Sequence, residues 1–132
     1  MRLCLRGQDI GWLTVGLRRE AEGATQWKRF DVRPEQFLNS VLQALNAWNV
    51  AVEQLTSVAV VLGPGSFTAL RDSLTIANTI CYVHGLPIAG ITAEQTDADD
   101  KVMDRLAEVP ARLTTSAVPK YGAEPNITKP KN

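Results

Sequence analysis

The sequence lacks the features that mark membrane, secreted and zinc-cluster proteins. No apolar run approaches the roughly 18 to 20 residues that span a bilayer. The N-terminus, MRLCLRGQDIG, has no long apolar stretch before a small-residue cleavage site, so a signal peptide is not expected. The 2 cysteines are too few for a zinc cluster, and both lie in apolar stretches, where free cysteine usually packs as a small hydrophobe. These absences predict a cytoplasmic protein that does not contact membranes.

An excess of charge of either sign is also absent, because 14 Lys and Arg balance 14 Asp and Glu. Strong binding to nucleic acid through counterion release needs a surplus of basic residues on one face, so it is not the default expectation. A chain of 132 residues has the size of one ordinary domain and buries roughly two-thirds of its unfolded surface. We therefore expect one compact domain.

The first 32 residues favour three antiparallel strands. Leu3 and Leu5 alternate with more polar neighbours, which is the period of a half-buried strand. Gly7 and Gln8 are predicted to form the turn that follows, before strands over about residues 10–17 and 26–32. Short loops between such strands predict an antiparallel meander.

The next part of the chain alternates helices and strands. Pro34 suits the first position of a helix, and the apolar residues after it recur at three- and four-residue spacing. The run SVAVVL at 57–62 is typical of a strand buried on both faces of a sheet. A helix over about 67–84, ended by Gly85, and a strand over 86–91 complete a βαβ unit. The order βββαβαβ predicts an α/β protein with a mixed five-stranded sheet and helices packed on it.

From residue 93 the composition becomes more polar. The segment DADDKVMDRL predicts a short charged surface helix with few apolar positions, which Pro110 ends. The last residues carry three of the seven prolines and favour an extended tail. We therefore divide the chain into a domain over 1–92, a charged helix or linker over 93–116, and a tail over 117–132.

The most distinctive stretch is GPGSFTALR, between a predicted buried strand and a predicted helix. Glycines at such a place can present backbone N–H groups to a phosphate. Alternatively, the glycines only turn the chain and the serine caps the helix. A Walker loop is excluded because no GK[ST] follows, and GxGxxG fails as well. The candidate anion-binding residues are Gly63, Gly65, Ser66, Thr68 and Arg71.

Both predicted helices carry more apolar surface than packing on one sheet face requires, which is about 100° of the helix. Such a surplus favours an interface with another chain, and deeper burial within this domain is the alternative. An interface predicts that Leu74→Glu abolishes association and leaves the fold intact. The predicted contact residues are Phe37, Val41, Leu45, Trp48, Leu70, Leu74, Ala77 and Cys81.

No catalytic constellation emerges from the sequence. His84 is the only histidine and stands at the end of a predicted helix without a nearby Cys or carboxylate pattern. Ser66 lacks the GxSxG elbow of a nucleophile. Asp97, Asp99 and Asp100 do not complete a calcium loop and are interpreted as a solvated helix start. We expect no catalytic residue and no metal site.

The segment VVLGPGSFTALRDSLTIANTICYVHGLPIAGIT resembles the hallmark of the TsaB (YeaZ) family, whose pattern is close to GPGSFTGLR, an Ala-rich helix, then LP and a Gly-containing strand. The opening MRLCLRGQDIGWLTVGL resembles the first hairpin of that family, and VPKYGAEPNITKPK resembles its closing P-x-Y segment. The resemblance implies the actin-like, Hsp70-like ATPase (RNase H-like) fold. It also implies a non-catalytic role in making N6-threonylcarbamoyladenosine at position 37 of tRNAs that read ANN codons.

The resemblance further implies partners. The chain would pair with a TsaD-like catalytic subunit through its first two helices, a TsaE-like ATPase would join that pair, and tRNA would be contacted only indirectly. A homodimer of the chain alone, with another binding task, and a nucleotide-binding protein that uses the GPGSF turn remain alternatives.

The sequence departs from the family pattern at several points. Gly7 and Gln8 stand where the family has the Asp-Thr pair that begins the phosphate loop, so no ATP cofactor is expected. Ala69 stands where the family has the glycine after SFT. Most of the family's second domain has no counterpart, because only about twenty residues separate the last predicted strand from the tail. These departures predict a shortened, non-catalytic member.

Overall fold

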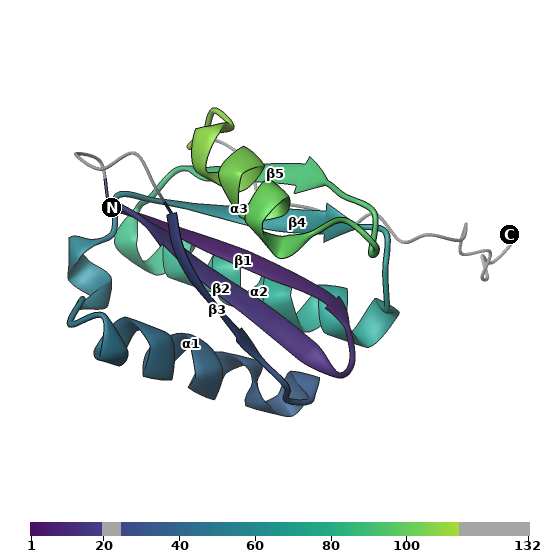
Figure 1. Ribbon diagram of the computed structural model, residues 1–132. Coiled ribbons are helices and arrows are strands. Elements are labelled where there is room, and N and C mark those ends of the chain that lie inside the picture. Colours follow the sequence, from purple (N-terminus) through teal and green to yellow (C-terminus); the bar gives the residue numbers. More distant parts are fainter. Residues whose placement is uncertain (20–24, 114–132) are drawn as a thin grey trace, which may run out of the picture.

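The computed structural model describes residues 1–19 and 25–113, which form one mixed sheet with helices on both faces (Figure 1). The strand order is β3-β2-β1-β4-β5. The pairs β1–β2 and β2–β3 are antiparallel, and the pairs β1–β4 and β4–β5 are parallel. The predicted mixed five-stranded sheet is therefore confirmed. The strands are β1 (Arg2–Asp9), β2 (Trp12–Arg18), β3 (Thr25–Phe30), β4 (Ser57–Gly63) and β5 (Ile88–Thr92).

The helices form two layers around this sheet. Helices α1 (Phe37–Ala47) and α2 (Phe67–His84) cover one face, and α3 (Asp99–Glu108) covers the other (Figure 1). Short 3-10 turns, η1 (Pro34–Gln36) and η2 (Val52–Gln54), precede α1 and β4. Helix α2 has the predicted bounds, and Gly85 ends it in the left-handed conformation with φ 66°. No helix among the described residues is long and apolar enough to cross a membrane.

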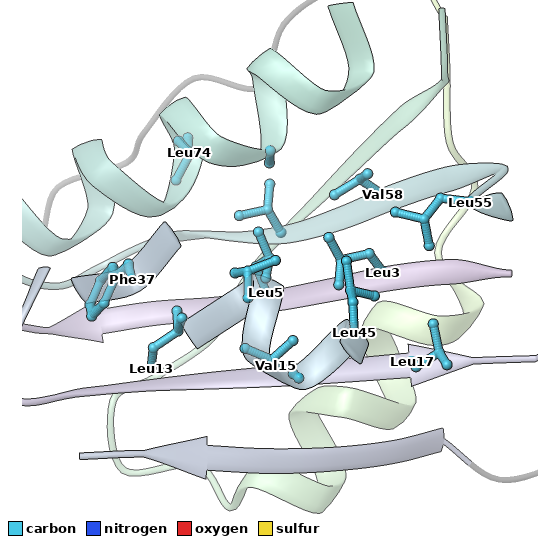
Figure 2. Close-up of a cluster of buried hydrophobic side chains, with 14 of the residues drawn as sticks. Leu3, Leu5, Leu13, Val15, Leu17, Phe37, Leu45, Leu55, Val58 and Leu74 are labelled. Atoms are coloured by element: carbon cyan, nitrogen blue, oxygen red, sulfur yellow. The ribbon is translucent and has the colours of Figure 1, made fainter. Parts of the chain in front are cut away.

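The larger core lies between the sheet and the helices α1 and α2. Successive residues of a strand point to opposite faces, so alternate residues of β1, β2 and β4 line this core. Leucine and valine side chains from these strands meet Phe37 and Leu45 of α1 and Leu74 of α2 (Figure 2).

A second, smaller core lies under α3. Val102, Met103 and Leu106, the few apolar positions of that segment, are fully buried against Cys4 of β1 and apolar residues of β4 and β5. The predicted helix is present, but it closes the second face of the sheet and is not a surface linker. For the same reason β1 is buried from Leu3 to Gln8 on both faces, where alternation predicted a half-buried strand. The tail over 117–132 lies outside the described residues.

The predicted turn at Gly7 and Gln8 is wrong, because both residues continue β1. The strand pairs with β2 up to Asp9 opposite Trp12, so the turn is formed by residues 10–11. Gly7 serves helix packing: a Cβ at this position would lie 2.8 Å from the Cβ of Ser73 in α2. Its lack of a side chain lets α2 approach β1 closely.

The two thiols are expected to be unreactive in the folded protein. Burial raises the pKa of Cys4 to about 12 and the pKa of Cys81 to about 11. The thiolate is the reactive form, so at about pH 8 almost none is present at either position. We expect no fast reaction with Ellman's reagent at that pH, and complete reaction of both thiols after unfolding in guanidinium chloride. Fast labelling of the folded chain would contradict this description of the two cores.

Candidate functional site

The eight side chains predicted to contact a partner lie mostly on the inner side of α1 and α2. Trp48 is partly buried, and the other seven are at most 7% exposed within the core against the sheet. A side chain without exposed surface cannot touch a second protein while its helix stays in place. The structure therefore corrects the role of these residues, which hold the two helices on the sheet. The seven are Phe37, Val41, Leu45, Leu70, Leu74, Ala77 and Cys81.

Other apolar residues of the same helices are exposed. Leu38 and Leu42 of α1 are 53% and 48% exposed, and Tyr82 and Val83 of α2 are 89% and 65% exposed. Helix α1 contains no charged residue, and α2 contains none between Asp72 and its end apart from His84. Depletion of charge, with tyrosine present, is typical of the centre of protein interfaces. We call this surface the outer helix face and define it by Leu38, Leu42, Thr75, Thr79, Tyr82 and Val83.

The sequence carried a signal for this surface but did not identify its residues. Leu38 and Leu42 widen the apolar stripe of α1, so a surplus was visible. Periodicity cannot tell which part of a wide stripe faces the sheet, because both parts have the same spacing.

The GPGSFT turn lies where β4 ends, next to the end of β1. The Ser66 hydroxyl accepts a hydrogen bond from the Ala69 N–H at 3.4 Å and so caps α2, while the Ser66 N–H donates to the Gln8 carbonyl at 2.8 Å. Arg71 pairs with Asp72 at 3.6 Å. These contacts support the second of the two interpretations offered above, in which the glycines turn the chain and the serine caps the helix.

Gly65 is required at this turn by a close approach of two backbones. A Cβ at Gly65 would lie 2.5 Å from the carbonyl oxygen of Gln8 and 3.0 Å from its Cα, and backbone atoms cannot rotate away. We expect Gly65→Ala to lower the free energy of unfolding by about 1–3 kcal/mol, measured by urea denaturation. Gly11→Ala is the matched control, because the nearest atom there, a carboxylate oxygen of Asp9, is 3.9 Å away. Equal stability of the two variants would contradict the close approach.

A buried arginine lies beside this turn on the α3 side of the sheet. Arg6 of β1 is 0% exposed, and its guanidinium donates to the Gln8 side-chain oxygen at 2.7 Å and to a carboxylate oxygen of Asp99 at 2.9 Å. It also donates to main-chain oxygens of the loop between β5 and α3. These are the carbonyls of Glu94 at 3.0 Å, Gln95 at 3.3 Å and Asp97 at 2.8 Å. All five N–H donors of a guanidinium thus have an acceptor.

Asp99 balances this buried charge. Its side chain is 8% exposed and accepts hydrogen bonds from Arg6 at 2.9 Å, Arg29 at 3.0 Å and Thr14 at 3.2 Å. The guanidinium of Arg29 also lies 4.0 Å from the centre of the Trp12 ring. The interpretation of Asp99 as part of a solvated helix start is therefore wrong, because Asp99 forms a buried ion pair with Arg6 of β1.

Gln8 connects the same group of residues to the neighbouring strands. Its side-chain N–H₂ donates to the carbonyls of Pro64 at 2.8 Å and Ala93 at 2.6 Å. The side chain of Gln95 donates in turn to the Gln8 carbonyl at 3.0 Å. We call Arg6, Gln8, Gln95 and Asp99 the Arg6 cluster. It occupies the carboxyl ends of β1, β4 and β5, the edge at which open α/β sheets usually bind ligands.

The remaining candidates for catalysis or metal binding do not form a site among the described residues. His84 is exposed on the last turn of α2. Within the described residues, no three His, Cys, Asp or Glu side chains gather in a way that could hold a metal ion.

The sequence matches proteins of tRNA modification. A family model described as "TsaD: tRNA N6-adenosine threonylcarbamoyltransferase" matches residues 34–118. The tRNA N6-adenosine threonylcarbamoyltransferase of Listeria monocytogenes is 37% identical over 57 residues, which are 43% of this chain and 17% of that protein. The tRNA threonylcarbamoyladenosine biosynthesis protein TsaB of Bacillus subtilis is 32% identical over 57 residues, 43% of this chain and 25% of that protein.

Among solved structures, YeaZ from Pseudomonas aeruginosa has a similar fold. Its TM-score is 0.61 at 19% sequence identity, and the match covers 69% of this chain and 43% of that one. The matched parts thus span less than half the length of each of these three proteins. Because the family model matches well over half of the residues, this chain belongs to the TsaD family so described, and its resemblance to TsaB (YeaZ) proteins is confirmed.

Proposed function

We propose that this chain is a non-catalytic partner subunit in the synthesis of N6-threonylcarbamoyladenosine at position 37 of tRNAs that read ANN codons. It binds and stabilises a TsaD-like catalytic subunit through the outer helix face, and a TsaE-like ATPase joins that pair. The observation that carries the proposal is the exposed, uncharged and apolar surface of α1 and α2 in a chain of this family.

The chemistry of the outer helix face favours a protein partner over tRNA. A surface that binds tRNA needs basic side chains for the phosphates, and α1 has none. Leu38, Leu42 and Val83 would instead leave water on binding, which stabilises association by roughly 25 cal/mol for each Å² of apolar surface. Tyr82 adds a large aromatic ring that can be buried in an interface while its hydroxyl group makes a hydrogen bond. The tRNA would therefore be reached through the partner.

The proposed non-catalytic role agrees with the contacts of the two side chains best suited to catalysis. The Ser66 hydroxyl accepts the N–H of Ala69 and serves as a helix cap. His84 is exposed and stands without a Cys or carboxylate pattern nearby. The reacting groups would come from the TsaD-like partner.

The proposal is tested by mixing this protein with the TsaD-like subunit of the same organism and measuring the mass of the complex by chromatography with light scattering. We expect a one-to-one complex. Leu42→Glu places an unpaired charge in the interface and should weaken binding by about 100-fold or more. Leu113→Glu is the matched control, because Leu113 is exposed to a similar degree but lies outside both helices, and it should bind as the wild type does.

Absence of a complex at tens of micromolar, or equal affinity of the two variants, would contradict the proposal. The second candidate is a homodimer through the same surface, which an uncharged face favours because two copies do not repel one another. It predicts twice the monomer mass for the chain alone, lost in Leu42→Glu and kept in Leu113→Glu.

A further inference from the structure

The actin-like ATPase fold implies a nucleotide at the carboxyl ends of the central strands. We infer that this chain binds no nucleotide there, because the Arg6 cluster occupies this edge of the sheet and because N–H groups of the β1–β2 turn and of the start of α2 already have acceptors within the chain. Three parts of the site carry this inference: the β1–β2 turn, the start of α2 and the guanidinium of Arg6. None of them depends on the proposed partner.

The first part is the end of β1 with the turn after it, where the resemblance places the start of the family's phosphate loop. Here the chain continues as β1 through Gly7 and Gln8, so no loop opens at these positions. At the turn that follows, a carboxylate oxygen of Asp9 accepts the Gly11 N–H at 3.2 Å. This contact already uses one of the N–H groups of the turn, which is therefore not free to bind a phosphate.

The second part is the start of α2, where backbone N–H groups favour anions in many proteins. The Ser66 N–H is used by the Gln8 carbonyl, and the Ala69 N–H is used by the Ser66 hydroxyl. Gly65 packs directly on Gln8, since even a Cβ at Gly65 would lie 2.5 Å from the Gln8 carbonyl oxygen. Gly65 and β1 therefore leave no space for a phosphate between them.

The third part is Arg6, a buried cation at this edge of the sheet. Its donors are all used, and its side chain has no exposed surface. To bind a phosphate, Arg6 would have to release Asp99 and the carbonyls of the loop between β5 and α3. Those contacts hold α3 on the sheet, so phosphate binding would compete with folding.

The inference is tested on the chain alone by its melting temperature with and without millimolar ATP and magnesium, ADP and magnesium, or inorganic phosphate. A ligand that binds only the folded state raises the melting temperature once its concentration exceeds the dissociation constant. We expect a change below about 1 °C with each compound, and no heat of binding by titration calorimetry. A rise of several degrees with either nucleotide would overturn the inference.

Gln8→Ala tests whether the side chain acts as described. We expect its melting temperature to fall by several degrees, because the carbonyls of Pro64 and Ala93 lose their donor and Arg6 loses an acceptor. Gln43→Ala is the matched control, since Gln43 is exposed on α1, and it should melt as the wild type does. If Gln8→Ala gains a nucleotide response, the side chain was occupying this edge of the sheet, as inferred. If Gln8→Ala melts like Gln43→Ala, the inference is overturned.

Discussion

Replacing Arg6 with methionine is expected to lower the free energy of unfolding by about 3–5 kcal/mol. The substitution keeps a long side chain but leaves Asp99 with one charged partner fewer, and it removes the guanidinium donor from three main-chain carbonyls. Breaking a buried ion pair from one side is costly because the remaining charge stays away from water. Urea denaturation followed by circular dichroism measures this difference.

Two further variants test whether the loss of stability comes from breaking the buried ion pair, and not from replacing any arginine. Arg33→Met removes an exposed arginine that pairs with Glu35 at 3.6 Å, and it should change stability by at most about 1 kcal/mol. Arg6→Lys keeps the charge but loses the planar fork that reaches several acceptors, so it should fall between the wild type and Arg6→Met. A stability of Arg6→Met within about 1 kcal/mol of the wild type would contradict the buried cluster.

Leu74→Glu is expected to unfold the protein, at a cost of about 4 kcal/mol or more. Leu74 is 2% exposed and packs in the core between α2 and the sheet (Figure 2). Truncating a buried leucine already costs about 2–5 kcal/mol, and a carboxylate at the same place finds no partner there. Loss of the cooperative thermal transition in circular dichroism is the measurement.

The same change on the outer helix face is the control. Leu42→Glu should stay within about 1 kcal/mol of the wild type, because Leu42 is 48% exposed and its new charge is solvated. A folded Leu74→Glu variant would mean that α2 is not seated as described. The structure thus changes the design suggested by the sequence: association must be tested at Leu42, because a change at Leu74 removes the fold together with any interface.

Most elements of the fold could be predicted because their signals are local. Helix α2 lies between a serine cap and a glycine in the left-handed conformation, and both residues act within one turn of the helix. The unbroken apolar run at 58–62 predicted a strand with both faces buried, and β4 is that strand. The residues of the GPGSFT turn also take the helix-cap contacts that the sequence offered as one of two alternatives.

The site could be predicted only in part. The sequence indicated that α1 and α2 have surplus apolar surface, but it assigned the partner contact to residues that the sheet covers. Arg6 alternates with leucines in β1, and a charged residue in such a pattern is normally interpreted as solvent-facing. Nothing close to it in the chain indicates burial, because its partner Asp99 lies 93 residues away.

The sequence by itself determined the order of the elements, the mixed sheet and the family resemblance, since these depend on motifs and on neighbours a few residues apart. Only the tertiary structure decided which side of α1 and α2 faces outward, that α3 closes the second face of the sheet, and that Arg6 and Gln8 fill the edge where a ligand would bind. The physical reason is that burial is a property of packing between distant segments. A charged side chain such as Arg6 is stable in the interior only when folding brings hydrogen-bond acceptors from distant segments next to it.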